Sequence, residues 1–240
     1  MTAEKKIRKV NGKARVLVVD DHPLIREGLR QMIELQPDLI FHGEAPDAQS
    51  AMAAVMAKRP DLVLLDLRLG NGDGLELIKF FRARFPELRI LVVSQFDETI
   101  YAERTLRAGA HGYVMKEQPT SEVLAAIKAI LSGQLYVGTR LAAIALHKML
   151  ETKPGNHEHP ASGIEMLTDR ELQIFHLLGA GLKAQKIAQE LKLSVKTVET
   201  HRENIKHKLG FGSAVELAHH AVSWVQTNGQ AIVSSGQLAG

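Results

Sequence analysis

The sequence predicts two domains of different class: an α/β domain built on a doubly wound, five-stranded parallel sheet, and a C-terminal all-α, four-helix domain. Apolar strand-like runs alternate with helical patterns five times between residues 15 and about 133. Two of these runs, 15–20 and 61–66, are continuous aliphatic stretches that end in aspartate. Such stretches suit the centre of a parallel sheet covered on both faces. Beyond residue 167 only helical patterns remain.

Hydrophobic periodicity gives the expected elements of the first domain, which we place at 14–133. Strand-like runs cover 15–20, 39–45, 61–66, 89–94 and 111–115, and helical patterns cover 23–36, 47–58, 74–85, 97–108 and 119–132. Repeated β-α units imply parallel strands joined by right-handed crossovers. We therefore expect helices on both faces of the sheet.

The pattern changes after the first domain, and residues 134–163 read as a linker. Apolar residues at helical spacing predict a connecting helix over 139–151, and residues 152–163 are rich in turn formers. Helical patterns then cover 168–180, 184–191, 195–208 and 213–226, which places the second domain at 164–226. The small, polar tail from Thr227 is expected to fray.

Composition excludes several classes of protein. The 240 residues include no cysteine, so a disulfide framework and a thiolate metal site are excluded. No apolar run approaches the roughly 20 residues that span a bilayer, and the polar, basic N-terminus lacks a signal-peptide core. We expect a soluble, cytoplasmic protein with no membrane partner. The net charge is only +3, so any nucleic-acid surface must be local.

Three aspartates end the two most apolar strands. Asp20 and Asp21 follow the first run, and Asp66 follows the third. In open parallel sheets, ligands bind just beyond the carboxyl ends of the strands, so these carboxylates should converge. Crowded anions repel unless a cation joins them, and oxygen ligands suit Mg²⁺. The sequence therefore predicts a magnesium site.

The first domain resembles a two-component response-regulator receiver domain, a flavodoxin-like fold, over residues 14–133. Four motifs carry the resemblance: Val-Val-Asp20-Asp21-His22, Leu-Leu-Asp66, Val-Val-Ser94 and Tyr113-Val-Met-Lys116. Each motif alone is weak, but the four occur in the right order, each at an expected strand end. The resemblance makes Asp66 the acceptor of a phosphoryl group from the phosphohistidine of a sensor histidine kinase. It implies Mg²⁺ held by Asp20, Asp21, Asp66 and the backbone carbonyl of Arg68.

The same resemblance assigns roles to three further side chains. Lys116 would pair with the phosphoryl oxygens as a point charge, and Ser94 would donate its hydroxyl to one of them. Tyr113 would be the rotating aromatic residue that couples phosphorylation to the output face. Taken singly, each has a plainer interpretation: a solvated lysine, a turn serine and a half-buried tyrosine. Asp20 alone would be a helix N-cap.

Three other classes of protein compete with this interpretation: a phosphatase, a nucleotide-binding domain and a binding module that is never phosphorylated. A haloacid-dehalogenase-type phosphatase needs a second aspartate two residues after its nucleophile, where this chain has Arg68. A nucleotide-binding Rossmann domain needs a Gly-rich motif after the first strand, which is missing. We therefore expect no enzyme. A binding module that never receives phosphate is a further alternative, and the presence of all five acidic-site residues argues against it. One departure from the receiver pattern is Gly70, where the family usually has proline.

The second domain opens with a capping-box pattern, Thr168 with Glu171. Two short helical patterns follow, separated by the turn 192–194, and Ser194 suits the N-cap of the second. This arrangement predicts a helix-turn-helix. Residues 167–222 resemble the LuxR-type (NarL/FixJ-type) DNA-binding domain, which implies double-stranded DNA as a partner.

The second helix of this motif should enter the major groove, with Val198, Ile205 and Leu209 facing the core. Exposed positions suit two kinds of DNA contact, against the alternative of a merely solvated helix face. Base-edge contacts are expected from Glu199, Thr200 and Glu203, and phosphate contacts from Lys183, Lys196, Thr197, Arg202, Lys206 and Lys208.

The last helical pattern has two interpretations that the sequence leaves open. Its apolar residues could form a homodimer surface or cover the core: Val215, Leu217, Ala218, Ala221 and Val222. His157 and His159 lack further ligands nearby and are expected to be solvated. Together the two resemblances predict a transcription factor that is phosphorylated, binds DNA and dimerises when active.

Overall fold

The computed structural model describes residues 12–69, 72–96, 98–139, 141–143 and 163–229. It divides into two compact units, Met1–Glu151 and Thr152–Gly240, which are considered separately. Within the described residues, no helix has the length and hydropathy needed to cross a membrane.

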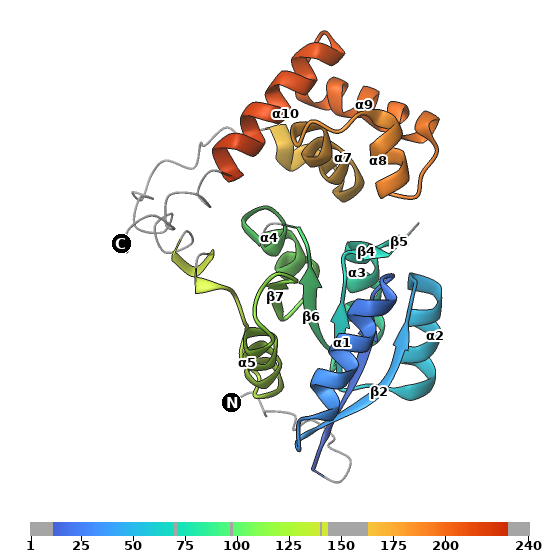
Figure 1. The fold of residues 1–240 in the computed structure, drawn as a ribbon, viewed down its shortest axis with the longest axis vertical. Helices are drawn as coiled ribbons and strands as arrows, with labels where there is room; N and C mark the ends of the chain where they lie inside the picture. The colour runs from blue at the N-terminus through green and yellow to red at the C-terminus, as the bar shows by residue number, and fades with distance from the viewer. Residues whose placement is uncertain (1–11, 70–71, 97, 140, 144–162, 230–240) are drawn as a thin grey trace. The chain divides into compact units, whose positions relative to one another are not determined.

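A five-stranded parallel sheet forms the centre of the first unit (Figure 1). The strands lie in the order β2-β1-β3-β6-β7, which confirms the predicted doubly wound sheet. Their bounds are β1 Ala14–Val19, β2 Leu39–Ala45, β3 Leu62–Leu65, β6 Arg89–Ser94 and β7 Gly112–Met115. The order reverses beside β1 and β3, and ligands bind at such a switch point.

The five expected helices are also present, with ends within two residues of those predicted. They are α1 Pro23–Glu34, α2 Ala48–Lys58, α3 Gly74–Arg84, α4 Glu98–Ala108 and α5 Thr120–Leu131. Pro23 suits the first position of α1 because its missing N–H needs no partner there. Asp47 and Asp73 cap α2 and α3 with side-chain hydrogen bonds.

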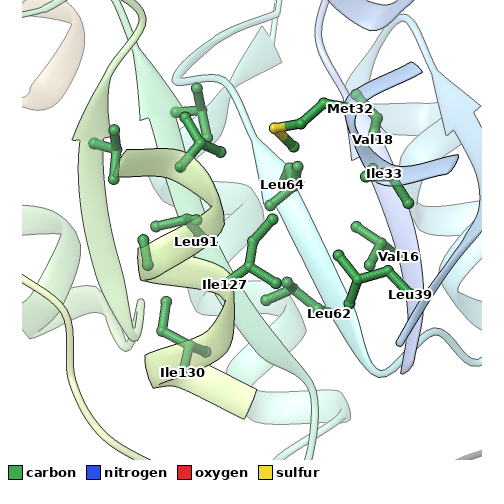
Figure 2. Packing of buried hydrophobic residues seen from close by; sticks show 14 of the residues in the cluster. Val16, Val18, Met32, Ile33, Leu39, Leu62, Leu64, Leu91, Ile127 and Ile130 are labelled. Carbon is green, nitrogen blue, oxygen red and sulfur yellow. The ribbon is translucent and has the colours of Figure 1, made fainter. Parts of the chain in front are cut away.

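One layer of the core lies between the sheet and helices α1 and α5 (Figure 2). Side chains alternate along a strand, so every second residue of β1 and β3 points into this layer. Its labelled members are Val16, Val18, Met32, Ile33, Leu39, Leu62, Leu64, Leu91, Ile127 and Ile130. The intervening strand residues, such as Leu17 and Val63, are buried as well. Burial on both faces accounts for the continuous aliphatic runs.

A short antiparallel pair follows the third strand and was not predicted. It joins β4 (Arg68–Leu69) to β5 (Gly72–Asp73), with Arg68 opposite Asp73. Strands of two residues are too short to show a periodic pattern, so they could not be predicted. Gly70, which stands where the receiver family usually has proline, lies outside the described residues.

The chain beyond α5 pairs with the edge of the sheet. The Tyr136 N–H donates to the His111 carbonyl at 2.9 Å, and the Tyr113 N–H donates to the Tyr136 carbonyl at 3.2 Å. Gly112 permits this approach, because a Cβ there would lie 2.7 Å from the Tyr136 carbonyl oxygen. The Tyr136 hydroxyl donates to Glu122, and burial together with this contact raises the pKa of Tyr136 to about 12. Most of the predicted helix 139–151 lies outside the described residues.

The second unit is helical, as predicted. It contains η1 Gly163–Met166, α7 Asp169–Gly179, α8 Ala184–Glu190, α9 Val195–Leu209 and α10 Ala214–Gly229. The capping box of Thr168 and Glu171 is present, and Ser194 caps α9 through the Thr197 N–H at 3.0 Å. The expectation that the chain frays from Thr227 is wrong for residues 227–229, because α10 continues to Gly229; the rest of that tail, 230–240, lies outside the described residues.

Helix α10 divides its apolar residues between the core and the surface. Leu217 and Ala221 are buried, so they cover the core, whereas Val215 is 78% exposed. Trp224 packs edge-on against Phe175 of α7, with ring centroids 5.5 Å apart. Core packing therefore applies to the inner face of α10. For its outer face, the homodimer interpretation stays a prediction.

Candidate functional site

The predicted acidic cluster forms at the carboxyl ends of β1 and β3. Asp20 and Asp66 are almost fully buried, at 1% and 2% exposure. The Asp66 N–H donates to the Val19 carbonyl at 2.8 Å, which holds the two strand ends side by side. One ligand atom each from Asp20, Asp21, His22 and Asp66 lies within 4.8 Å of the others. The structure thus brings together the three predicted carboxylates.

Lys116 reaches this cluster from the end of β7. Its Nζ lies 2.6 Å from Asp20 Oδ2 and 2.7 Å from Asp66 Oδ2. Its backbone N–H donates to the Ser94 carbonyl at 2.8 Å, which fixes where the side chain starts. The other Asp66 oxygen, Oδ1, is buried and accepts no hydrogen bond from the described residues. Burial raises the pKa of Asp66, the Asp20 charge adds to the rise, and Lys116 opposes it.

Ser94 and Tyr113 converge on Phe96. The Ser94 hydroxyl oxygen accepts from the Phe96 N–H at 3.3 Å, and Ser94 is fully buried. The Tyr113 hydroxyl donates to the Phe96 carbonyl at 2.7 Å. The Phe96 ring stacks on Tyr101 with centroids 4.8 Å apart. Ser94 and the buried Tyr113 are therefore connected through the backbone of Phe96.

Two residues at the site, His22 and Gly74, were not among the predicted site residues. His22 Nδ1 lies 2.8 Å from Asp21 Oδ1 and 3.3 Å from Asp20 Oδ1. Its Nε2 lies 3.0 Å from Arg68 Nη2. The plainer interpretation of Asp20 as an N-cap is wrong, because His22 is the N-cap residue of α1. In the sequence, His22 is the last residue of the first receiver motif, directly after the aspartate pair, but no role was predicted for it.

Gly74 is the second missed residue, and it sets how closely α3 approaches the turn after Asp66. Its N–H donates to the Leu67 carbonyl at 3.1 Å. A Cβ on Gly74 would lie 2.6 Å from Leu67 Cα and 2.8 Å from the Asp66 carbonyl oxygen. Only glycine fits this contact without moving the backbone that carries Asp66.

In the second unit, α9 carries the residues predicted to contact DNA, except Lys183, which is the N-cap residue of α8. Val198 and Ile205 are fully buried, which confirms the predicted core face. Among the predicted contact residues, the exposed ones are Lys183, Lys196, Glu199, Thr200 and Glu203, and the half-buried ones are Thr197, Arg202, Lys206 and Lys208.

Ion pairs neutralise the two glutamates on this helix. Arg202 Nη1 lies 2.8 Å from Glu199 Oε1, and Lys206 Nζ lies 2.6 Å from Glu203 Oε2. The hydrogen bond from Lys206 lowers the pKa of Glu203. These pairs reduce the repulsion that two glutamates would otherwise exert on phosphates.

Lys208 has a different environment from the other predicted phosphate ligands. Its Nζ lies 2.6 Å from Oε2 of Glu171, which is 4% exposed. The same carboxylate oxygen accepts the Thr168 N–H of the capping box at 2.8 Å. Burial alone would raise the pKa of Glu171, but the hydrogen bonds from Lys208 and Thr168 outweigh it and lower the pKa. This pair joins the end of α9 to the start of α7.

Both units match known families, and together these define the class of protein. The first matches the response regulator receiver domain over residues 16–128, and the second matches the bacterial regulatory proteins of the luxR family over residues 165–221. Oxygen regulatory protein NreC of Staphylococcus aureus (strain MRSA252) is 32% identical over 209 residues, which cover 87% of this chain and 96% of that protein. The chain therefore belongs to the two-component response regulators with a LuxR-type DNA-binding domain, which control transcription.

Solved structures agree with this assignment. A LuxR-family two-component response regulator from Aurantimonas sp. SI85-9A1 is 34% identical, with a TM-score of 0.55, over 58% of this chain and 99% of that one. RcsB of Salmonella typhimurium is 22% identical, with a TM-score of 0.60, over 88% of this chain and 98% of that one. At that identity the likeness to RcsB concerns the fold.

Proposed function

We propose that Asp66 accepts a phosphoryl group from a sensor histidine kinase and that the phosphorylated chain binds promoter DNA as a homodimer. The observation that carries the proposal is the buried Asp66 carboxylate, which has Lys116 on one oxygen and no hydrogen bond from described residues on the other. A carboxylate held in this way is an oriented nucleophile. The Oδ1 atom is free to attack phosphorus, and bond formation there would displace the kinase histidine.

Each neighbouring side chain has a task in this transfer. Lys116 neutralises Asp66 before the reaction and can pair with a phosphoryl oxygen afterwards, because its Nζ already lies between Asp20 and Asp66. Ser94 offers a hydroxyl donor at the end of the next strand. The carboxylates of Asp20 and Asp21 suit a divalent cation, which they would hold with Asp66 and the Arg68 carbonyl. A bound Mg²⁺ would neutralise charge on the transferring group.

The contacts around Phe96 support a route from the acceptor to the surface of the receiver. If Ser94 turns its hydroxyl toward a phosphoryl oxygen, its contact with the Phe96 N–H changes. Tyr113 binds the carbonyl of the same residue, so its position responds. Tyr113 also donates its backbone N–H to the Tyr136 carbonyl. We propose that this series of contacts carries the phosphorylation signal toward the chain beyond α5.

Phosphorylation should require a divalent cation. Incubated with acetyl phosphate and Mg²⁺, the full chain is expected to gain one phosphoryl group by intact mass, and to gain none in EDTA. Asp21→Ala should weaken Mg²⁺ binding, measured by titration calorimetry, because it removes one of three converging carboxylates. Equal labelling rates in Mg²⁺ and in EDTA would contradict the magnesium part of the proposal.

For the DNA-binding unit, the exposure of α9 supports insertion of its Glu199–Glu203 face into the major groove. Glutamate can accept from cytosine N4, and lysine suits phosphate. We exclude Lys208 from the proposed phosphate ligands, because the buried Glu171 holds its charge. The solved RcsB structure bound to promoter rprA and that of two RcsB dimers on two parallel DNAs supply precedent for DNA binding and dimers.

Two substitutions on α9 should separate the two kinds of DNA contact. Lys206→Ala is expected to weaken binding similarly on all sequences and to flatten the salt dependence by about one unit, as a lost phosphate contact does. Glu203→Ala should change the preferred sequence, because one base contact discriminates by about 1–3 kcal/mol. Selection from a random DNA library, with salt titrations on the selected site, measures both. An unchanged site for Glu203→Ala would refute its assignment to a base edge.

A further inference from the structure

The side chain of His22 contacts the aspartate pair and also Arg68, which follows Asp66. Neither the family motif nor the position of His22 at the start of α1 accounts for these contacts. It follows Asp20 and Asp21 and serves as the N-cap residue of α1, yet its ring makes no capping hydrogen bond. The backbone N–H instead donates to Asp20 Oδ1 at 2.8 Å. The imidazole is 44% exposed, so burial does not explain its position.

The partners of the ring fix which nitrogen carries the proton. Arg68 Nη2 lies 3.0 Å from Nε2, and a guanidinium can only donate. Nε2 must therefore accept, which leaves the proton on Nδ1 of a neutral ring. This nitrogen donates to Asp20 Oδ1 at 3.3 Å and also lies 2.8 Å from Asp21 Oδ1, close enough for a charge contact.

We propose that His22 is a positioning residue for the divalent cation. Its Nδ1–H donates to Asp20 Oδ1, and Nδ1 lies 2.8 Å from Asp21 Oδ1, so the ring limits rotation of both carboxylates that would hold the cation. Its Nε2 accepts a hydrogen bond from the side chain of Arg68, which lies in β4, two residues after Asp66. One ring therefore connects the aspartate pair to the segment that follows Asp66. Partners that orient metal ligands change metal affinity by about 10–100-fold when they are removed.

The inference rests on the proposed magnesium site, and the test separates the two. Titration calorimetry of the full chain with Mg²⁺ needs no phosphoryl donor. His22→Ala is expected to raise the Mg²⁺ dissociation constant about tenfold. His22→Asn restores an N–H donor near Nδ1 and should recover most of the affinity. His42→Ala, which removes a receiver histidine bonded to the Lys58 carbonyl, should leave the constant unchanged.

Two further readouts distinguish positioning from direct ligation and from loss of structure. Saturating Mg²⁺ should restore acetyl phosphate labelling of His22→Ala toward the wild-type rate, because the chemical groups remain. Electron spin-echo spectroscopy of the Mn²⁺-loaded protein should show no directly coordinated imidazole nitrogen.

Three outcomes would overturn the proposal. A wild-type dissociation constant in His22→Ala would mean that the ring does not orient the ligands. A coordinated nitrogen signal would make His22 a ligand itself. A wild-type chain that binds no Mg²⁺ would remove the proposed site as well.

Discussion

Asp66→Asn is expected to abolish phosphorylation by acetyl phosphate, with no gain of mass under conditions that label the wild-type chain fully. The amide is a poor nucleophile and cannot form the acyl phosphate. Asp20 and Asp21 would remain, but Asp20 already binds Lys116 through one oxygen and the His22 N–H through the other, and we assign both aspartates to the cation. The variant should also lose any increase in DNA affinity on treatment with acetyl phosphate. To move a mostly inactive population to a mostly active one, the phosphoryl group must favour the active state by about 5 kcal/mol. Asp66→Asn removes this contribution.

Asp61→Asn provides a matched control for this experiment. Asp61 is another buried aspartate, at the opposite end of β3, and it accepts hydrogen bonds from Arg15 at 2.8 and 3.0 Å. An asparagine there keeps an acceptor, and labelling should persist. If Asp66→Asn still gained a phosphoryl group at the wild-type rate, a different residue would be the acceptor.

Lys208→Ala is expected to destabilise the second unit by about 2 kcal/mol, because a hydrogen bond to a charged group contributes about that much. The substitution leaves the buried Glu171 carboxylate with the capping contacts of Thr168 but without its cation. Trp224, the only tryptophan, packs on Phe175 of this unit. Its fluorescence during urea unfolding of the full chain therefore reports this unit, and the midpoint should fall by about 1 M.

Lys186→Ala is the control for lost surface charge. Lys186 is 60% exposed and lies 3.6 Å from Glu190, so its removal should cost less than about 0.5 kcal/mol. Equal midpoints for both variants would contradict a structural role for Lys208.

The Glu171 contact also predicts a pH dependence for the second unit. Its pKa in the folded state lies below the ordinary value of 4.5. Its contribution to stability is therefore complete above that value and is lost as the pH falls through the folded pKa. Lys208→Ala should weaken this acid sensitivity, measured by the same fluorescence at pH 3 to 6, roughly the range over which a carboxylate titrates.

The central strands and the place of Asp66 at a strand end could be predicted because their signals are local. The runs ending at Asp20 and Asp66 are aliphatic throughout, since both faces of β1 and β3 are buried. A polar residue that ends such a run lies at the carboxyl end of its strand, where ligands bind in parallel sheets, and this does not depend on how the helices pack. The carboxylates and Lys116 therefore converge as expected.

The roles of His22 and Lys208 could not be predicted, because each depends on a partner far along the chain. His22 meets Arg68, 46 residues away, and Lys208 meets Glu171, 37 residues away. Helical spacing marks Lys208 as an outward-facing cation near the end of α9. Only the approach of α9 to the start of α7 shows that a buried carboxylate binds it.

The pairing of Tyr136 with β7 has a consequence for how the receiver is handled as a separate fragment. Strand edges with unpaired backbone groups recruit other chains and promote aggregation. A fragment cut at Gly133, where the composition changes, would lose the Tyr136 backbone that pairs with His111 and Tyr113. It would also expose the Gly112 backbone, which has no side chain to obstruct a foreign strand. The residues that cover this edge of the sheet therefore lie beyond the last helix of the receiver.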